Sequence, residues 1–213
     1  MAGLGDWTQQ PRFIAFEGGE GSGKSTQARM LATALENAGC DVLLTREPGG
    51  TPGAEAIRNL LLDPPGDGWN ARSEALLFAA ARSDHVERAI RPALDRGAWI
   101  VCDRFVGSSL AYQGVAGGLG IDDILSLHQF GSGGAMPDLT FLIGVSERTS
   151  NQRRAERGGS GDAIENREAA FHTLVRDGFV SLAETFGEGW VIIDGEGSAD
   201  HLHSEIIREL QTR

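Results

Sequence analysis

The chain has 213 residues, of which 40% are hydrophobic and 23% are charged, as is usual for one soluble globular domain. This apolar content can form a core, which excludes disorder as the dominant state. The formal net charge of −11 argues against nucleic acid as a partner, because sequence-independent binding depends on neutralising phosphates. No apolar run reaches the roughly 20 residues of a membrane helix, and residues 1–10 lack a signal-like pattern. We therefore expect a cytoplasmic protein with no membrane contact.

Short apolar runs alternate with helical patterns along the chain. The predicted strands, which resemble buried parallel strands, are Phe13–Glu17, Asp41–Thr45, Trp99–Cys102, Leu139–Gly144 and Trp190–Ile193. The predicted helices are Ser25–Asn37, Glu55–Leu62, Ser73–Leu94 with a break near Pro92, Asp122–Phe130, Glu147–Arg157, Glu165–Phe186 and Ser198–Gln211. This alternation predicts an α/β fold, in which helices cover both faces of a mostly parallel sheet.

A glycine-rich segment between the first predicted strand and helix fits the phosphate-loop pattern G-x-x-x-x-G-K-[ST] at every position. Its glycines let backbone N–H groups turn toward phosphate oxygens, and the helix N-terminus adds partial positive charge. Lys24, the only lysine of the chain, would reach the β- and γ-phosphates, and the Ser25 hydroxyl would ligate Mg²⁺. We therefore predict binding of ATP and Mg²⁺. The predicted ATP-binding residues are Gly18, Gly19, Glu20, Gly21, Ser22, Gly23, Lys24, Ser25 and Thr26.

The phosphate loop alone leaves three classes open: a small-molecule kinase, a GTPase switch, and an ATPase or adaptor. A GTPase reads guanine with an N-K-x-D motif, and the chain has no second lysine to supply it. A motor ATPase usually needs a longer chain. A kinase for a phosphorylated acceptor needs a second anion site built from arginines, and the chain has many candidates.

Further motifs follow the second and third predicted strands, at the edge of the sheet where ligands bind in such folds. The first is Thr45-Arg-Glu-Pro-Gly-Gly-Thr51, and the second is Asp103-Arg104-Phe105. A carboxylate such as Asp103 can hold Mg²⁺ or its waters, and an arginine such as Arg104 can bind a phosphate through two hydrogen bonds. A third segment, Arg153–Asp162, has three arginines before Gly-Gly-Ser-Gly, which is typical of a flap that closes over anions.

With these motifs, the chain resembles the bacterial thymidylate kinases, which phosphorylate dTMP to dTDP with ATP. The resemblance covers nearly the whole chain and rests on Phe16–Thr26, Thr45–Thr51, Leu77–Arg82 with His85, Asp103–Phe105, Ser108–Gly114 and Pro137–Thr140. It implies one domain over residues 1–213 with the three-layer fold of P-loop nucleoside monophosphate kinases and a five-stranded sheet. It also implies a lid at about residues 153–163, and a homodimer whose interface includes part of the helix predicted at Ser73–Leu94.

The resemblance further implies roles for residues of the dTMP site. Phe78 is similar to the phenylalanine that stacks on thymine, Arg82 to the arginine that hydrogen-bonds the base, and Ser109 and Gln113 to residues that read its edge. Glu20 would contact the sugar 3′-hydroxyl, Tyr112 would crowd the 2′ position, and Arg46, Arg58 and Arg104 would bind the acceptor phosphate. The implied dTMP site comprises Glu20, Arg46, Pro48, Arg58, Phe78, Arg82, Arg104, Ser108, Ser109, Tyr112 and Gln113.

One departure from the family pattern concerns the cationic charge needed for catalysis. Some relatives have an arginine directly after the acidic residue of the phosphate loop, where this chain has Gly21. The lid must then supply the charge from Arg153, Arg154 or Arg157, and we favour Arg157. The implied catalytic residues are Lys24, Asp103, Arg104, Arg153 and Arg157, and the implied Mg²⁺ ligands are Ser25 and Asp103. The alternatives are another nucleoside or nucleotide kinase on the same scaffold, or a nucleotide-binding protein without turnover.

Overall fold

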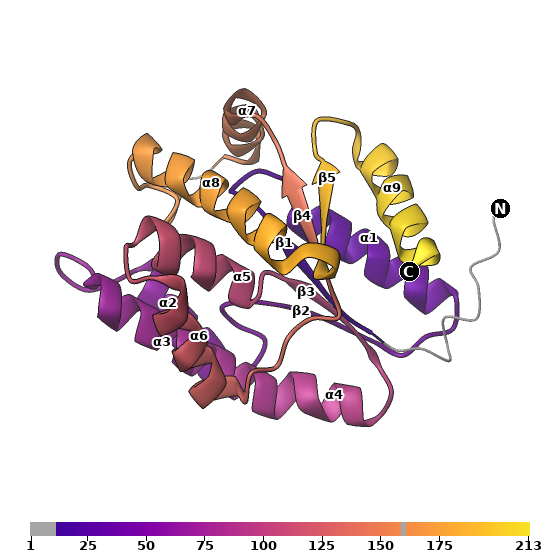
Figure 1. Ribbon diagram of the computed structural model, residues 1–213, viewed down its shortest axis with the longest axis horizontal. Helices are drawn as coiled ribbons and strands as arrows, with labels where there is room; N and C mark the ends of the chain where they lie inside the picture. Colours follow the sequence, from indigo (N-terminus) through magenta and orange to yellow (C-terminus); the bar gives the residue numbers. More distant parts are fainter. Residues whose placement is uncertain (1–11, 159–160) are drawn as a thin grey trace.

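The computed structural model describes residues 12–158 and 161–213, which form layers of helices around a parallel sheet (Figure 1). Within these residues the sheet has five strands in the order β2-β3-β1-β4-β5. They are β1 (Phe13–Glu17), β2 (Val42–Arg46), β3 (Trp99–Asp103), β4 (Leu139–Gly144) and β5 (Trp190–Asp194). All four neighbouring pairs are parallel, so the carboxyl ends of the strands meet at one edge.

Helices cover both faces of this sheet. They are α1 (Lys24–Asn37), α2 (Pro52–Leu62), α3 (Ala71–His85), α4 (Arg91–Asp95), α5 (Val106–Ser109), α6 (Ile121–Ser132), α7 (Glu147–Arg157), α8 (Ala169–Phe186) and α9 (Ala199–Thr212). Two π-helical turns, η2 (Val86–Ile90) and η3 (Leu110–Ala116), extend α3 and α5, and the 3₁₀ turn η4 (Gly187–Gly189) follows α8. None of the helices in the described ranges is both long enough and apolar enough to span a membrane.

The strand residues alternate between two hydrophobic cores. Ile14 and Phe16 of β1 pack with α1 and α9, which lie side by side on one face of the sheet (Figure 1). Phe13 and Ala15 face the other core, which α3, α4, α6 and α8 help to form. Helix α1 presents Ala28, Leu31, Ala32 and Leu35 to the sheet, a spacing that keeps apolar side chains on one helical face. The predicted three-layer α/β fold is confirmed.

The predicted strands are confirmed with bounds that shift by one residue at most, whereas the helix predictions need correction at four places. Helix α2 begins at Pro52, because the Thr51 side chain accepts the Ala54 N–H and caps the helix there. Helix α8 begins at Ala169 instead of residue 165, because the Asp162 carboxylate accepts the N–H groups of residues 164 and 165 and holds that stretch in a turn. The segment 106–116, for which no helix was predicted, forms α5 and η3.

The predicted break at Pro92 is wrong, because the helix continues from Ala71 to Asp95 through a change of hydrogen-bond pattern. In the π-helical turn η2, the Arg91 N–H donates to the Val86 carbonyl five residues earlier. Pro92 then lies in the first turn of α4, where its missing N–H and its restricted φ are compatible with a helix.

Candidate active site

A cavity of about 570 Å³ lies where the first three strands end, between the phosphate loop, α3, η3 and the segment that follows α7. It is lined by predicted site residues from distant parts of the chain: Glu20, Gly21, Gly23, Lys24, Ser25, Thr26, Arg46, Pro48, Arg58, Phe78, Asp103, Arg104, Ser108, Tyr112, Gln113 and Arg153. Sequence reasoning missed other lining residues, namely Arg29, Glu47, Leu62, Glu156, Asp162, Ile164 and Glu165. The sheet therefore brings most of the predicted ATP and dTMP residues to one cavity, whereas Gly18, Gly19, Ser22, Arg82 and Ser109 lie outside its lining.

The phosphate loop connects β1 to α1 and has the backbone shape that its glycines allow. Gly21 and Gly23 have φ values of +70° and +101°, in the left-handed region that other residues rarely adopt. A Cβ atom on Gly21 would lie 2.7 Å from the Ser150 carbonyl of α7, so this position also lacks space for a side chain. Among the described residues, no side chain caps the start of α1. Its first N–H groups are therefore available to an anion.

Lys24 lies folded against this loop. Its ammonium donates to the Gly19 carbonyl at 2.7 Å and to Ser22 Oγ at 3.3 Å. Burial and, to a smaller extent, the nearby Arg104 guanidinium lower the pKa of Lys24 to about 8, although Glu20 and Asp103 partly oppose the change. These two acceptors replace only part of the hydration that the buried ammonium has lost. An incoming polyphosphate would supply further acceptors and would therefore stabilise the charged form of Lys24.

Ser25 and Asp103 meet at the same end of the cavity. The Ser25 hydroxyl donates to Asp103 Oδ2, whereas Asp103 Oδ1 is buried without a hydrogen-bond partner in the part of the chain that is described. A buried carboxylate oxygen without a donor fits a cation that is bound by a few oxygens. No three His, Cys, Asp or Glu side chains in the described ranges gather to hold a metal by themselves. The two residues therefore fit Mg²⁺, which usually keeps water and phosphate oxygens as its remaining ligands.

Arg104 bridges the third strand and the phosphate loop. It is the one described non-glycine residue with positive φ (+70°), a costly conformation for an arginine. Its guanidinium donates to the Gly18 carbonyl at 2.9 Å and to Ser108 Oγ at 3.0 Å, and it forms an ion pair with Glu20. Burial opposes the charged form, but the attraction of Glu20 and other carboxylates outweighs it and raises the pKa of Arg104. The site thus retains a fixed positive charge.

Glu17 is a site-supporting residue to which sequence reasoning assigned no role. It is 1% exposed, and its Oε1 accepts the N–H groups of Phe105 and Ser108, each at 2.9 Å. Its Oε2 accepts the Ser108 hydroxyl at 2.6 Å, and burial raises the pKa of Glu17. The carboxylate therefore caps α5 from β1 and holds Phe105 and Ser108 in place. Its sequence signal is an acid at the end of an apolar strand, directly before the phosphate loop.

The end of β2 and helix α2 supply two further arginines. Arg58 of α2 donates to the Pro48 carbonyl at 2.7 Å, and Arg46 forms an ion pair with Glu55 at 3.2 Å. The Glu47–Pro48 peptide bond is cis. Together with Arg104, these two arginines place three cations around the cavity. We call Arg46, Arg58 and Arg104 the acceptor cluster, because an anionic group could bind among them.

The predicted base-contacting residues divide into two layers. Phe78 and Gln113 line the cavity, and we call this pair the base wall. Arg82 and Ser109 are buried and lie outside the lining. Arg82 donates to Glu47 Oε2 at 2.7 Å and to Ser109 Oγ at 2.8 Å, so the Glu47 carboxylate holds its guanidinium away from the cavity.

The predicted lid segment, about residues 153–163, begins within α7. Arg153 lines the cavity and donates to the Gly195 carbonyl at 2.9 Å and to the Ser22 carbonyl at 3.3 Å. Arg154 donates to the Glu165 carbonyl at 2.9 Å and does not line the cavity. The backbone of α7 ends at Arg157, but the Arg157 side chain and residues 159–160 lie outside the described part of the chain.

The fold and the cavity define a class of protein: a P-loop nucleotide kinase, with a phosphate loop facing a second cationic site. The family model for thymidylate kinase matches residues 16–206, and the chain belongs to this family. It is 52% identical over 200 residues to the thymidylate kinase of Rhizorhabdus wittichii, covering 93% of this chain and 96% of that relative. It is 46% identical over 194 residues to that of Caulobacter vibrioides, covering 91% and 93%. A solved structure of thymidylate kinase from Ehrlichia chaffeensis matches with a TM-score of 0.78 and 33% identity, covering 94% of this chain and 99% of that one.

The lowered pKa of Lys24 predicts proton uptake when ATP binds. Above about pH 8 the free protein holds Lys24 mostly neutral, and the phosphates favour its charged form, so binding at about pH 8.5 should take up a sizeable fraction of one proton. At about pH 6.5 the lysine is already charged and takes up none. Calorimetry in two buffers of different ionisation heat measures the uptake. Lys24→Arg, which stays charged, is the control, and equal uptake by both proteins would contradict the prediction.

Proposed function

We propose that the chain transfers the γ-phosphoryl group of ATP to dTMP and forms dTDP, a step in dTTP biosynthesis. One observation carries this proposal: a single cavity joins the Lys24 phosphate loop, the acceptor cluster and the base wall. ATP would lie with its phosphates on the loop, and dTMP with its phosphate among the acceptor cluster. Family membership supports both substrates. We also propose that the protein acts in the cytoplasm.

The reaction needs positioning and charge neutralisation more than acid–base chemistry. The acceptor is a phosphate oxygen that already carries negative charge, so no strong general base is required. Lys24 would hold the transferring phosphoryl group, and Arg104 would hold the acceptor phosphate in line with it. Ser25 and Asp103 would bind Mg²⁺, which when present neutralises charge on the ATP phosphates. The product forms directly, without a covalent enzyme intermediate.

The sugar of dTMP would lie beside Glu20 and Tyr112. The Tyr112 hydroxyl donates to Glu20 Oε1 at 3.2 Å, and the Tyr112 ring lies under the Arg104 guanidinium, 5.4 Å from its central carbon. In this arrangement the Glu20 carboxylate would accept the 3′-hydroxyl, and the fixed Tyr112 ring would crowd the 2′ position. Phe78 would stack on the base and Gln113 would read its edge, with Arg82 and Ser109 behind them.

The proposed activity is tested with a panel of nucleoside monophosphates in a coupled assay of ADP release. The expected result is that dTMP is the preferred acceptor, because buried polar groups left unpaired by the wrong base can discriminate by about 10⁴ or more. Lys24→Met should retain less than about 10% of the activity while its melting temperature stays near that of wild type. Preference for another acceptor would favour a different nucleotide kinase, and ATP binding without turnover would favour a binding protein.

We further propose that a lid arginine contacts the phosphoryl group during transfer, because Gly21 offers no side chain for this purpose. Arg157→Ala should lower kcat more than it raises KM for dTMP, since a contact made mainly in the transition state affects kcat. An arginine in this role contributes about 10³ or more in rate. Arg153→Ala and Arg154→Ala, made singly and combined with Arg157→Ala, show how much each arginine contributes to kcat. A near-normal kcat in the triple variant would assign the charge to Arg104 instead.

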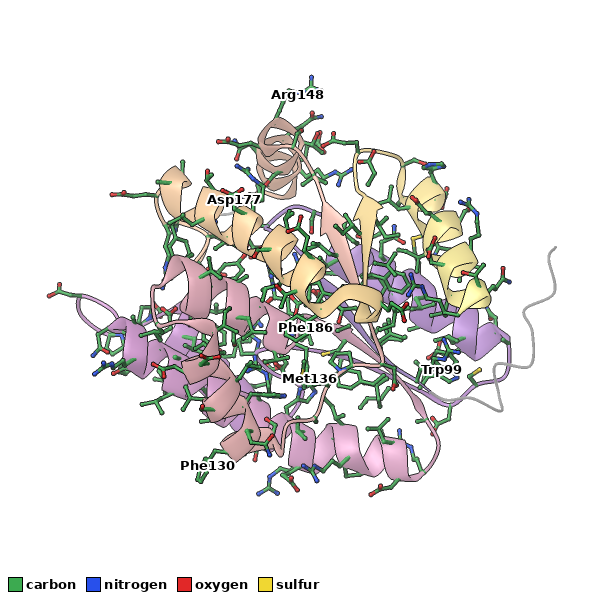
Figure 2. The ribbon with its side chains drawn as sticks, viewed as in Figure 1. Trp99, Phe130, Met136, Arg148, Asp177 and Phe186 are labelled. Carbon is green, nitrogen blue, oxygen red and sulfur yellow. The ribbon has the colours of Figure 1, made fainter. Side chains whose placement is uncertain are left out.

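The proposed homodimer has a candidate interface on α3 and α6. Phe130 of α6 is 94% exposed and points outward from the molecule (Figure 2). The exposed Leu76 of α3 lies near it, and both line a hollow of about 700 Å³ with Ala79, Ala80 and Leu127. A large apolar patch that is exposed in one chain is typical of an interaction surface. A second copy of this chain that packs there would cover it.

The interface is tested with Phe130→Arg, which places a charge in the centre of the patch. The variant should dissociate to monomers at protein concentrations where wild type is dimeric, because burying an unpaired charge is costly. Light scattering coupled to size exclusion measures the mass. Val180→Arg, at an exposed apolar position on α8, serves as the control and should remain dimeric. A monomeric wild type, or equal masses for both variants, would contradict the proposal.

A further inference from the structure

The Gln113 side chain of the base wall is bonded to a pair of charged residues behind it. Gln113 lies in η3, and its Nε2 donates to Glu74 Oε1 of α3 at 2.8 Å. The other oxygen of that carboxylate, Oε2, accepts from the Arg167 guanidinium in the segment before α8. Gln113 is 2% exposed and Glu74 is 7% exposed, so this contact is shielded from water. Residues from three separated parts of the chain thus meet at the base end of the cavity.

The chemistry of these groups determines which end of the Gln113 amide faces the cavity. A guanidinium can only donate hydrogen bonds, and a carboxylate paired with it can only accept them. The Gln113 atom that faces Glu74 must therefore be the donor, Nε2, and Oε1 lies at the opposite end of the amide. No protein donor reaches Gln113 Oε1 within residues 12–158 and 161–213. The side chain lines the cavity together with Phe78, which follows Glu74 by one turn of α3.

We propose that Glu74, held by Arg167, is a positioning residue that sets the base specificity of the site through Gln113. This inference rests on the proposed function. The Gln113 carbonyl is turned toward the base, where it accepts the N3–H of thymine. Cytosine has an unprotonated N3 in its place, so two acceptors would face each other with no proton between them. Glu74 touches no substrate and acts only by preventing the amide from turning over.

The mismatch should have a measurable effect because the contact is buried. A free glutamine amide could rotate by half a turn and offer Nε2 to cytosine, which would remove most discrimination at this position. With Glu74 behind it, that rotation would place Oε1 against a carboxylate, so the rotated form is disfavoured. Leaving a buried polar group unsatisfied at this one position corresponds to a factor of about ten to a hundred in kcat/KM.

The decisive variant is Glu74→Gln, which preserves the shape and reverses the bonding pattern. Arg167 can only donate, so it binds the oxygen of the new amide and turns the new NH₂ group toward Gln113. Gln113 then inverts to accept from it, and its own Nε2 faces the cavity. The ratio of kcat/KM for dTMP to that for dCMP should fall by about tenfold or more. A merely structural role would lower both values in parallel and leave the ratio unchanged, which would overturn the proposal.

Three further measurements complete the test. Glu87→Gln removes the same charge from the exposed ion pair with Arg91 and should leave the ratio unchanged. Glu74→Met removes the directing acceptor without reversing it, so the ratio should fall less than in Glu74→Gln. In wild type, 3-methyl-dTMP, which carries a methyl group in place of the N3 proton and keeps both carbonyls, should lose about tenfold or more in kcat/KM. This last result needs no variant to fold, and an undiminished kcat/KM would overturn the proposal.

The outcomes also separate this inference from the proposed function. If wild type fails to phosphorylate dTMP, the proposed function is wrong. If wild type prefers dTMP and the Glu74→Gln ratio matches that of wild type, only the positioning role is wrong.

Discussion

The arrangement of the site depends on the buried guanidinium of Arg104. It bonds to the phosphate-loop carbonyl of Gly18, pairs with Glu20 and reaches Ser108 on the helix that follows β3. Because Arg104 adopts a left-handed conformation, its side chain turns back toward β1 instead of following the chain into α5. The conformation is unfavourable for an arginine, and the contacts at both ends of the residue offset its cost. One of these is the Arg104 N–H, which donates to the Phe16 carbonyl of β1 at 2.9 Å.

Charge is distributed unevenly between the whole chain and its cavity. The chain carries a formal net charge of −11, yet Lys24, the acceptor cluster and Arg153 all line one cavity. Two nucleotides would bring several negative charges to this place, and the cations already present would attract them. In their absence the cations repel one another, which is one reason that the pKa of Lys24 is lowered beside Arg104. The lining also includes six carboxylates, which match its six cationic side chains, so the cavity is balanced in formal charge whereas the whole chain is strongly negative.

Local patterns in the sequence predicted the strands and the phosphate loop, and the resemblance to thymidylate kinases supplied most of the other predicted residues around the cavity. Phe13–Glu17 and Leu139–Gly144 have the predicted bounds, because short apolar runs between helical patterns identify buried strands. The segment that forms α5 and η3 was missed as a helix because its start depends on Glu17, a residue 88 positions away from Phe105. The placement of Arg82 behind the base wall depends in the same way on Glu47, 35 positions away. Both features come from buried carboxylates whose partners are distant in sequence, and no local pattern contains that information.

Buried carboxylates bind the side chains in and around the cavity. Glu17 accepts the hydroxyl of Ser108, Glu74 accepts the amide of Gln113, and Glu47 accepts the guanidinium of Arg82. Glu47 also bonds to His85 Nδ1 at 2.9 Å, and His85 in turn bonds to Thr45 at 2.7 Å, so this network returns to β2. A buried carboxylate can only accept, so each one directs the donors of its neighbour away from the cavity. Where the neighbour is the amide of Gln113, this leaves its acceptor at the end opposite to the carboxylate. These carboxylates therefore determine which atoms of the neighbouring side chains donate and where those donors point. The arginines and Lys24 supply the positive charge of the site.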